Sequence, residues 1–342
     1  MPTTQASQAA QSPRVGFIVP YAGEWPNWSQ LFFESCRPNP IVDVILLCQQ
    51  VPPFALPGNV RVVQISEAEI HDRLEKATGL KLGTISPRKI CDFRPYYGLA
   101  FADILKDYEF WGYCDVDMMF GALGKLLTDE VFQSMDVLSA HNEMFVGHFT
   151  ILRNTEKINR LGFEIEKWQE RCQAPIGWHL DEQEFTYVAD KNPTIRWIKS
   201  KDLASELNSN FARFGITFEF FGEVAYLKPP DNPVVKWENG GVYFEGSGGK
   251  VSEVLYVHFM GTKRWWHWLF FNKKSVLQKT HYFSRIGYNG VRHPAQLQRF
   301  PRREFYHLQS GLNRFKITVA AWLRRLLPVK TFVALRRKVL RI

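Results

Sequence analysis

Short apolar runs alternate with longer mixed segments in the first part of the chain. Residues 14–23 predict a buried strand that leads into a loop, and residues 41–48 and 60–65 predict two further strands. Between the first two runs, residues 24–38 predict a crossover helix with an apolar side. Strands that alternate with helices in this way are typical of a mostly parallel sheet with helices on both faces. The fold class that we expect is therefore α/β.

A fourth apolar run, residues 110–121, carries two carboxylates, Asp115 and Asp117, separated by one residue. A buried strand avoids charge unless the charge is paired or bound to metal, and open α/β sheets bind ligands at the carboxyl ends of their strands. Two acids at such an end predict a site for a divalent cation, which can in turn hold a diphosphate. One alternative is a pair of solvated surface charges. Another is a dehalogenase-type phosphatase, which the continuation Met118-Met119-Phe120-Gly121 disfavours because that family continues into a Gly-Thr type turn.

Two motifs together resemble a known enzyme group. Asp115-Val-Asp117 resembles the Asp-x-Asp motif of nucleotide-sugar glycosyltransferases with the GT-A fold, in which the motif binds a metal ion and the donor diphosphate. Val254-Leu-Tyr-Val-His-Phe-Met-Gly-Thr-Lys-Arg-Trp-Trp266 resembles the His-Phe-x-Gly-x-x-Lys-Pro-Trp signature of the retaining enzymes related to lipopolysaccharide galactosyltransferases and glycogenin. The fold implied is GT-A-like, a Rossmann-like mixed sheet with helices on both faces.

The second motif implies further site residues. By resemblance, His258 is the third ligand of a Mn²⁺ or Mg²⁺ ion, Gly261 lets the backbone approach the diphosphate, and a cation neutralises the phosphates. Lys263 falls one residue early, and Arg264 stands before Trp265 where the family has Lys-Pro-Trp, so either side chain is a candidate for this cation. A core histidine on a buried strand is the alternative interpretation of His258, and it would be preferred without the two aspartates.

The segment Pro87-Arg-Lys-Ile-Cys-Asp-Phe-Arg-Pro-Tyr-Tyr-Gly98 resembles the Ser-Asp-x-x-Arg element of toxin-type and mannosyl-type glycosyltransferases. The resemblance implies that Asp92 and Arg94 contact the donor sugar and phosphate, although one residue separates them here instead of two. Lys89 is a further candidate donor contact, and Tyr21 is expected to stack on a uracil base or to contact its edge. The alternative is a helix start capped by Asp92, and both can hold because helix N-termini bind anions.

Asp181 and Glu182, in Gly177-Trp-His-Leu-Asp-Glu-Gln-Glu-Phe185, are the candidate catalytic residues. The segment resembles an Asp-Gln element that lies beside the donor sugar in retaining enzymes. Either acid could orient hydroxyl groups, or act as general base in an inverting enzyme. An ordinary acidic helix start explains the pattern equally well. The resemblance favours retention. His141, Asn142 and His148 are expected near the site without an assigned role.

The overall composition of the chain fits a large α/β domain. Its 342 residues are 45% hydrophobic and 15% aromatic, which is enough for a sizeable core. The five cysteines have no paired short spacing, which favours buried free thiols in a reducing compartment. Residues 1–12 lack the apolar stretch of a secretory signal, and no run reaches the length that spans a bilayer.

Positive charge is concentrated at the C-terminus. The formal net charge is +9, and residues 315–342 contain eight basic residues and no acidic one. The spacing predicts two amphipathic helices on either side of Pro328 that lie in an anionic membrane surface; the alternative is a helix docked on the domain with a solvated basic face. A nucleic-acid-binding protein is disfavoured because the charge is confined to this tail and would leave the candidate metal ligands unexplained.

These observations define four expected regions: a disordered leader (1–12), a GT-A-like catalytic domain (13–270), an acceptor-side connecting segment (271–313) and a basic membrane-associating tail (314–342). The function that the resemblance implies is transfer of a sugar from a nucleotide donor, with UDP-sugars favoured, to a glycan or lipid-linked acceptor in bacterial surface polysaccharide synthesis. The location implied is the cytoplasmic face of the inner membrane. The alternative is a non-catalytic GT-A-like protein that binds sugars or nucleotides.

Overall fold

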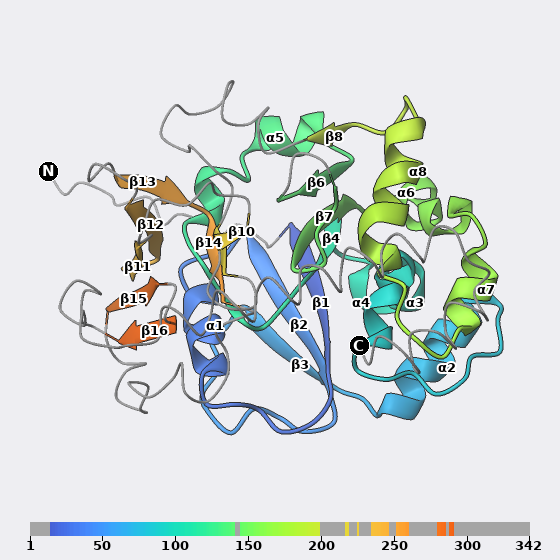
Figure 1. Cartoon of the computed structure of the whole chain (residues 1–342), viewed down its shortest axis with the longest axis horizontal. Helices are drawn as coiled ribbons and strands as arrows, with labels where there is room; N and C mark the ends of the chain where they lie inside the picture. The colour runs from blue at the N-terminus through green and yellow to red at the C-terminus, as the bar shows by residue number, and fades with distance from the viewer. Residues whose placement is uncertain are drawn as a thin grey trace, which may run out of the picture.

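The computed structural model describes residues 14–140, 144–198, 216–218, 224–225, 234–245, 251–259, 279–284 and 287–290. Within them a central seven-stranded sheet has the order β3-β2-β1-β4-β7-β6-β8 (Figure 1). Its strands are β1 (Val15–Tyr21), β2 (Val42–Cys48), β3 (Val60–Gln64), β4 (Phe110–Cys114), β6 (Val137–Ser139), β7 (Phe149–Arg153) and β8 (Trp197–Ile198). The four strands from β3 to β4 are parallel, and β7 runs antiparallel to both β4 and β6. The sheet is therefore mixed, and the expected α/β class is confirmed.

The order of the central strands reverses beside β1. The chain moves outward from β1 through β2 to β3 and then returns to form β4 on the other side of β1. In open α/β sheets such a reversal leaves a crevice outside the carboxyl ends of the two neighbouring strands, where ligands bind. Asp115 and Asp117 follow β4 at this crevice, and Tyr21 ends β1 there.

Helices cover both faces of this sheet, because alternate strand residues are apolar on each side. Phe17 and Val44 join the core that contains α1, whereas Ile18 and Ile45 join the core that contains α2. Figure 1 shows α1 on one side of the central strands and α2 to α4 with α6 to α8 on the other. The helices are α1 (Ser29–Cys36), α2 (Glu67–Thr78), η1 (Lys89–Tyr96), α3 (Tyr97–Ala100), α4 (Ala102–Leu105), η2 (Leu123–Lys125), α5 (Asp129–Ser134), α6 (Glu156–Asn159), η3 (Leu161–Glu164), α7 (Trp168–Gln173), η4 (Leu180–Glu184) and α8 (Phe185–Lys191).

Two smaller sheets extend the fold beyond β4. One has the order β10-β9-β14-β5, formed by β5 (Met118–Phe120), β9 (Ile216–Phe218), β10 (Val224–Ala225) and β14 (Tyr256–His258). The other has the order β13-β12-β11-β15-β16, formed by β11 (Val234–Glu238), β12 (Gly241–Glu245), β13 (Val251–Val254), β15 (Thr280–Ser284) and β16 (Gly287–Gly290). Antiparallel pairing of β14 with β5 places His258 opposite Met118, one residue after Asp117. This pairing unites the two metal-ligand motifs.

Several expected features differ in detail or lie outside the described residues. The helix that Asp92 was expected to cap is divided into a 3₁₀ helix and two short α-helices, with Asp92 and Pro95 inside the first. The expected connecting segment, residues 271–313, contributes β15, which pairs with β11 of the preceding domain. The leader and the basic tail lie outside the described residues. In the part of the chain that the structure describes, no helix has the length and apolar character needed to cross a bilayer.

All five cysteines are free thiols in the structure. Cys36, Cys48, Cys114 and Cys172 are buried, and Cys91 is half-buried. The expectation of free thiols is therefore confirmed. Burial raises the pKa of the Cys91 thiol to about 12, so this group is a poor nucleophile near neutral pH.

Candidate functional site

Asp115, Asp117 and His258 come together at the end of β4. One oxygen or nitrogen atom of each lies within 4.8 Å of the others. His258 Nε2 is 3.3 Å from Asp117 Oδ1 and 3.8 Å from Asp115 Oδ2. Asp117 and His258 are buried, while Asp115 is half-buried, so the group has one side open to the crevice.

The chemistry of this group fits a divalent cation. Two carboxylates and one imidazole are a donor set suited to Mn²⁺-like ions, and Mg²⁺ is also compatible with the carboxylates. Both ring nitrogens of His258 are buried and, among the described residues, neither has a hydrogen-bond partner. A buried imidazole without such partners is unfavourable, and a cation beside Nε2 would satisfy one of these atoms.

Arg94 links this group to the second acidic pair. Its Nη2 donates to Asp115 Oδ1 at 2.6 Å, and its Nη1 donates to Asp181 Oδ2 at 2.8 Å. The guanidinium is planar, so the two bonds hold both carboxylates in a defined orientation. The two carboxylate oxygens of Asp115 therefore have different neighbours: one faces Arg94, and the other faces His258 and the candidate cation position.

Asp181 and Glu182 differ sharply in their surroundings. Both belong to η4, a π-helical turn that follows His179 in the left-handed region. The Asp181 side chain is 1% exposed, whereas that of Glu182 is 31% exposed. A Cβ atom at Gly147 would lie 2.7 Å from Asp181 Oδ2 and closer still to Arg94, so a larger residue here would force this ion pair to shift. Glu182 is the more accessible of the two candidate catalytic acids.

Lys89 and Asp92 are buried in the protein and are absent from the cleft lining. Asp92 accepts hydrogen bonds from the backbone N–H groups of Trp178 and Leu180, at distances from 2.7 to 3.2 Å. Lys89 Nζ donates to Asp92 at 2.8 Å and to the Arg171 carbonyl. Successive N–H groups around a left-handed residue form a concavity that binds anions, and the Asp92 carboxylate occupies it here. The pair therefore holds the turn that carries Asp181.

A cleft of about 1010 Å³ lies at the strand reversal. Its walls come from the ends of β1 and β4, from η1 and from α2, and include Tyr21, Asp115, Asp117, Arg94, Cys91, His71 and Asp72. Tyr21 stacks on Trp25 with ring centroids 3.8 Å apart, which fixes the orientation of its ring in the wall. The volume suits a ligand of nucleotide size.

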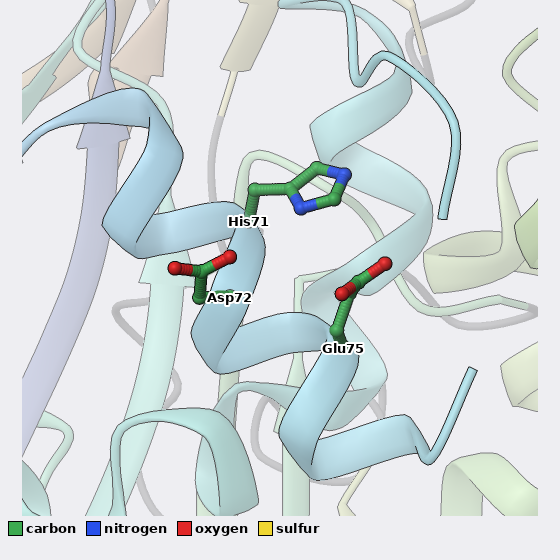
Figure 2. A group of neighbouring side chains, drawn as sticks. All are labelled: His71, Asp72 and Glu75. Carbon is green, nitrogen blue, oxygen red and sulfur yellow. The ribbon is translucent and has the colours of Figure 1, made fainter. Parts of the chain in front are cut away.

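A second group of metal-ligand types lies on α2. Figure 2 shows His71 and Asp72 projecting from one turn and Glu75 from the next, with His71 and Glu75 directed to the same side. The polar atoms of His71 and Glu75 are already engaged with the following loop. His71 Nε2 lies 3.2 Å from the Gly83 carbonyl, and Glu75 accepts from the Leu82 N–H at 2.7 Å and from Lys81 Nζ at 3.2 Å. We interpret this group as a clamp on the loop of residues 81–83.

Apart from Tyr21 in the cleft wall, the sequence-predicted residues divide into three sets. One set is connected by direct contacts, with Glu182 next to it in η4, and consists of Asp115, Asp117, His258, Arg94 and Asp181. Lys89 and Asp92 lie behind that group, and their predicted donor contacts stay predictions. Gly261, Lys263 and Arg264 lie outside the described residues. Sequence reasoning missed the role of Gly147 and assigned none to the adjacent His148, which stacks on His258. Nothing in the local sequence indicates the distant partners of these two residues.

Burial raises the pKa of the Asp181 carboxyl to about 8, with Glu182 and Asp92 adding to the rise and Arg94 opposing it. The unfolded chain releases this proton near the ordinary value of 3.8, whereas the folded chain holds it up to about 8. The stabilisation that the protonated Asp181 carboxyl contributes to the fold is therefore fully present below about pH 4 and is lost as the pH rises toward 8.

Asp181→Asn should remove this pH dependence, because the amide mimics the protonated acid. We expect the unfolding free energy of the variant, relative to that of wild type, to rise by on the order of a few kcal/mol from pH 5 to pH 8. Urea unfolding with a chelator present at several pH values measures it. A difference that does not change with pH contradicts the prediction.

The fold and site define an α/β protein with a candidate cation group at the mouth of a nucleotide-sized cleft. Residues 17–283 match the model of the family described as "Family of unknown function (DUF6625)", so the chain belongs to this family. A search of curated proteins found no match to the chain. The matched residues include Asp115, Asp117 and His258.

Proposed function

We propose that the chain is a metal-dependent glycosyltransferase with a GT-A-like fold. Its donor would be a nucleoside diphosphate sugar, with UDP-sugars favoured, and its acceptor a glycan or lipid-linked glycan in bacterial surface polysaccharide synthesis. The observation that carries the proposal is the convergence of Asp115, Asp117 and His258 beside the cleft, from segments about 140 residues apart in the chain. The resemblance of their motifs to those of retaining GT-A enzymes supports the same class.

The residues of the site would divide the work. Asp115, Asp117 and His258 would hold Mn²⁺ or Mg²⁺, which when bound supplies electrostatic stabilisation of a departing diphosphate. Arg94 orients Asp115 and adds a positive charge beside the phosphates. Tyr21 lies in the cleft wall, where it could contact the base. Glu182 is the acid with exposed surface and would contact a sugar or acceptor hydroxyl, whereas Asp181 serves as the partner of Arg94.

A non-catalytic nucleotide- or sugar-binding protein is the second candidate. The observation that favours it is the burial of Lys89, Asp92 and Asp181, three of the residues expected to contact donor or acceptor. Under this alternative the cation group and the cleft would bind a nucleotide, but no acid would act on it. The proposed membrane association rests on residues 314–342, which lie outside the described part of the chain.

Calorimetric titration of UDP and GDP, with and without Mn²⁺, tests the proposal. We expect one nucleotide to bind only when Mn²⁺ is present, and its identity would name the donor class. Slow Mn²⁺-dependent hydrolysis of the matching nucleotide sugar would then separate the enzyme from the binding protein. A folded chain that binds neither nucleotide would overturn the proposed function.

A further inference from the structure

We propose that His148 is a positioning residue for the candidate metal ligand His258, and that it acts by stacking on the His258 ring. The inference rests on the metal site of the proposed function. It concerns residues whose roles the motifs leave unassigned. The two imidazole rings lie nearly parallel, with centroids 4.3 Å apart and planes 24° from each other.

Metal-bound histidines are usually oriented by a hydrogen bond on the ring nitrogen that does not face the metal, and this bond fixes both ring rotation and tautomer. His258 Nε2 faces Asp115 and Asp117. Its Nδ1 is buried and has no hydrogen-bond partner among the described residues. Among the contacts of the described residues, the flat face of His148 lies against this ring and would restrain its rotation.

His148 is itself held in place. Its Nε2 shares a hydrogen bond of 2.8 Å with the hydroxyl of Tyr256, and the two rings meet edge to face. Tyr256 and His258 are two residues apart in β14, so they lie on the same face of that strand. His148 thus lies across both side chains. Its buried ring contacts the His258 ring from a fixed position.

The backbone of His148 also contacts the other half of the site. Its carbonyl accepts a hydrogen bond from the N–H of Asp115 at 3.2 Å. One residue therefore touches two of the three candidate ligands, Asp115 through the backbone and His258 through the side chain. Substitution of the side chain leaves the backbone contact available, so the stacking contribution can be measured by itself.

His148→Phe and His148→Leu form a matched pair for this purpose. Both remove the hydrogen bond to Tyr256 and keep a buried apolar side chain, but only phenylalanine keeps a flat ring against His258. With Mn²⁺ alone as the calorimetric probe, we expect His148→Leu to weaken binding about tenfold or more and His148→Phe to stay within about threefold of wild type. Tyr256→Phe reports the effect of the hydrogen bond alone.

The result that overturns the inference is equal Mn²⁺ affinity of the phenylalanine and leucine variants, whether both match wild type or both are weakened. Metal-free thermal unfolding identifies the folded samples, and His148→Met provides a second non-planar, more adaptable side chain if the leucine variant does not fold. The visible spectrum of bound Co²⁺ adds a signature of ligand geometry that general destabilisation does not change. Wild type that binds no Mn²⁺ overturns the metal site and this inference together, whereas metal binding without nucleotide binding counts against the proposed function only.

Discussion

Asp117→Asn is expected to abolish Mn²⁺-dependent nucleotide binding and any turnover while the protein stays folded. The side chain is buried, and its Oδ1 lies 3.3 Å from His258 Nε2. Asparagine has nearly the same shape, but it carries no charge and is a poorer ligand for a hard cation. We expect Mn²⁺ affinity to fall more than about 100-fold, since even partners outside the ligand set are worth about 10–100-fold.

Asp72→Asn is the matched control for this variant. Asp72 lies in the wall of the same cleft, but it belongs to the group on α2 (Figure 2). The same change of charge is made there, so any general electrostatic effect of the cleft is reproduced. We expect calorimetry to give Mn²⁺ and nucleotide affinities close to those of wild type. Loss of binding in Asp72→Asn with retention in Asp117→Asn would transfer the metal site to α2 and contradict our assignment.

The sequence indicated the two aspartate ligands better than the residues that complete the site and hold it in place. Asp115 and Asp117 could be predicted because they follow a buried apolar run, at the end where open α/β sheets bind ligands. His258 was linked to them only through a resemblance of motifs, since pairing between β5 and β14 depends on long-range strand contacts that no local pattern specifies. The same limit applies to Gly147, whose need for a missing side chain arises from Arg94 and Asp181, more than 30 residues away on either side.

The choice between Asp181 and Glu182 also required the structure. The two acids are adjacent in sequence and equally plausible in a helix start. The π-helical turn gives them different surroundings, because it directs Asp181 inward to Arg94 and leaves Glu182 partly exposed. Asp92 presents the converse case. Its motif resembles a donor-binding element, yet its hydrogen bonds go to a turn near residue 179, so a pattern of residue types did not identify its partners.

The burial of the Lys89–Asp92 ion pair leads to the second large expected effect. Asp92→Ala should destabilise the folded chain by about 3–5 kcal/mol, because it leaves Lys89 buried without its partner. The Lys89 and Asp92 side chains are only 3% and 1% exposed, so water cannot replace the lost contact without rearrangement. Two backbone N–H groups, of Trp178 and Leu180, lose their acceptor as well. Since small domains have total stabilities of about 5–15 kcal/mol, urea unfolding should detect the change readily.

The double variant Lys89→Met with Asp92→Asn separates the two causes. It removes both charges but keeps an acceptor oxygen for the turn, so we expect a loss of only about 1–2 kcal/mol. Hydrogen exchange gives a local measure of the same contact: the amides of Trp178 and Leu180 should exchange faster in Asp92→Ala and stay protected in the double variant. If the double variant loses as much stability as Asp92→Ala, the unpaired Lys89 charge is not the cause. If the two amides stay protected in Asp92→Ala, Asp92 does not hold the turn that carries Asp181.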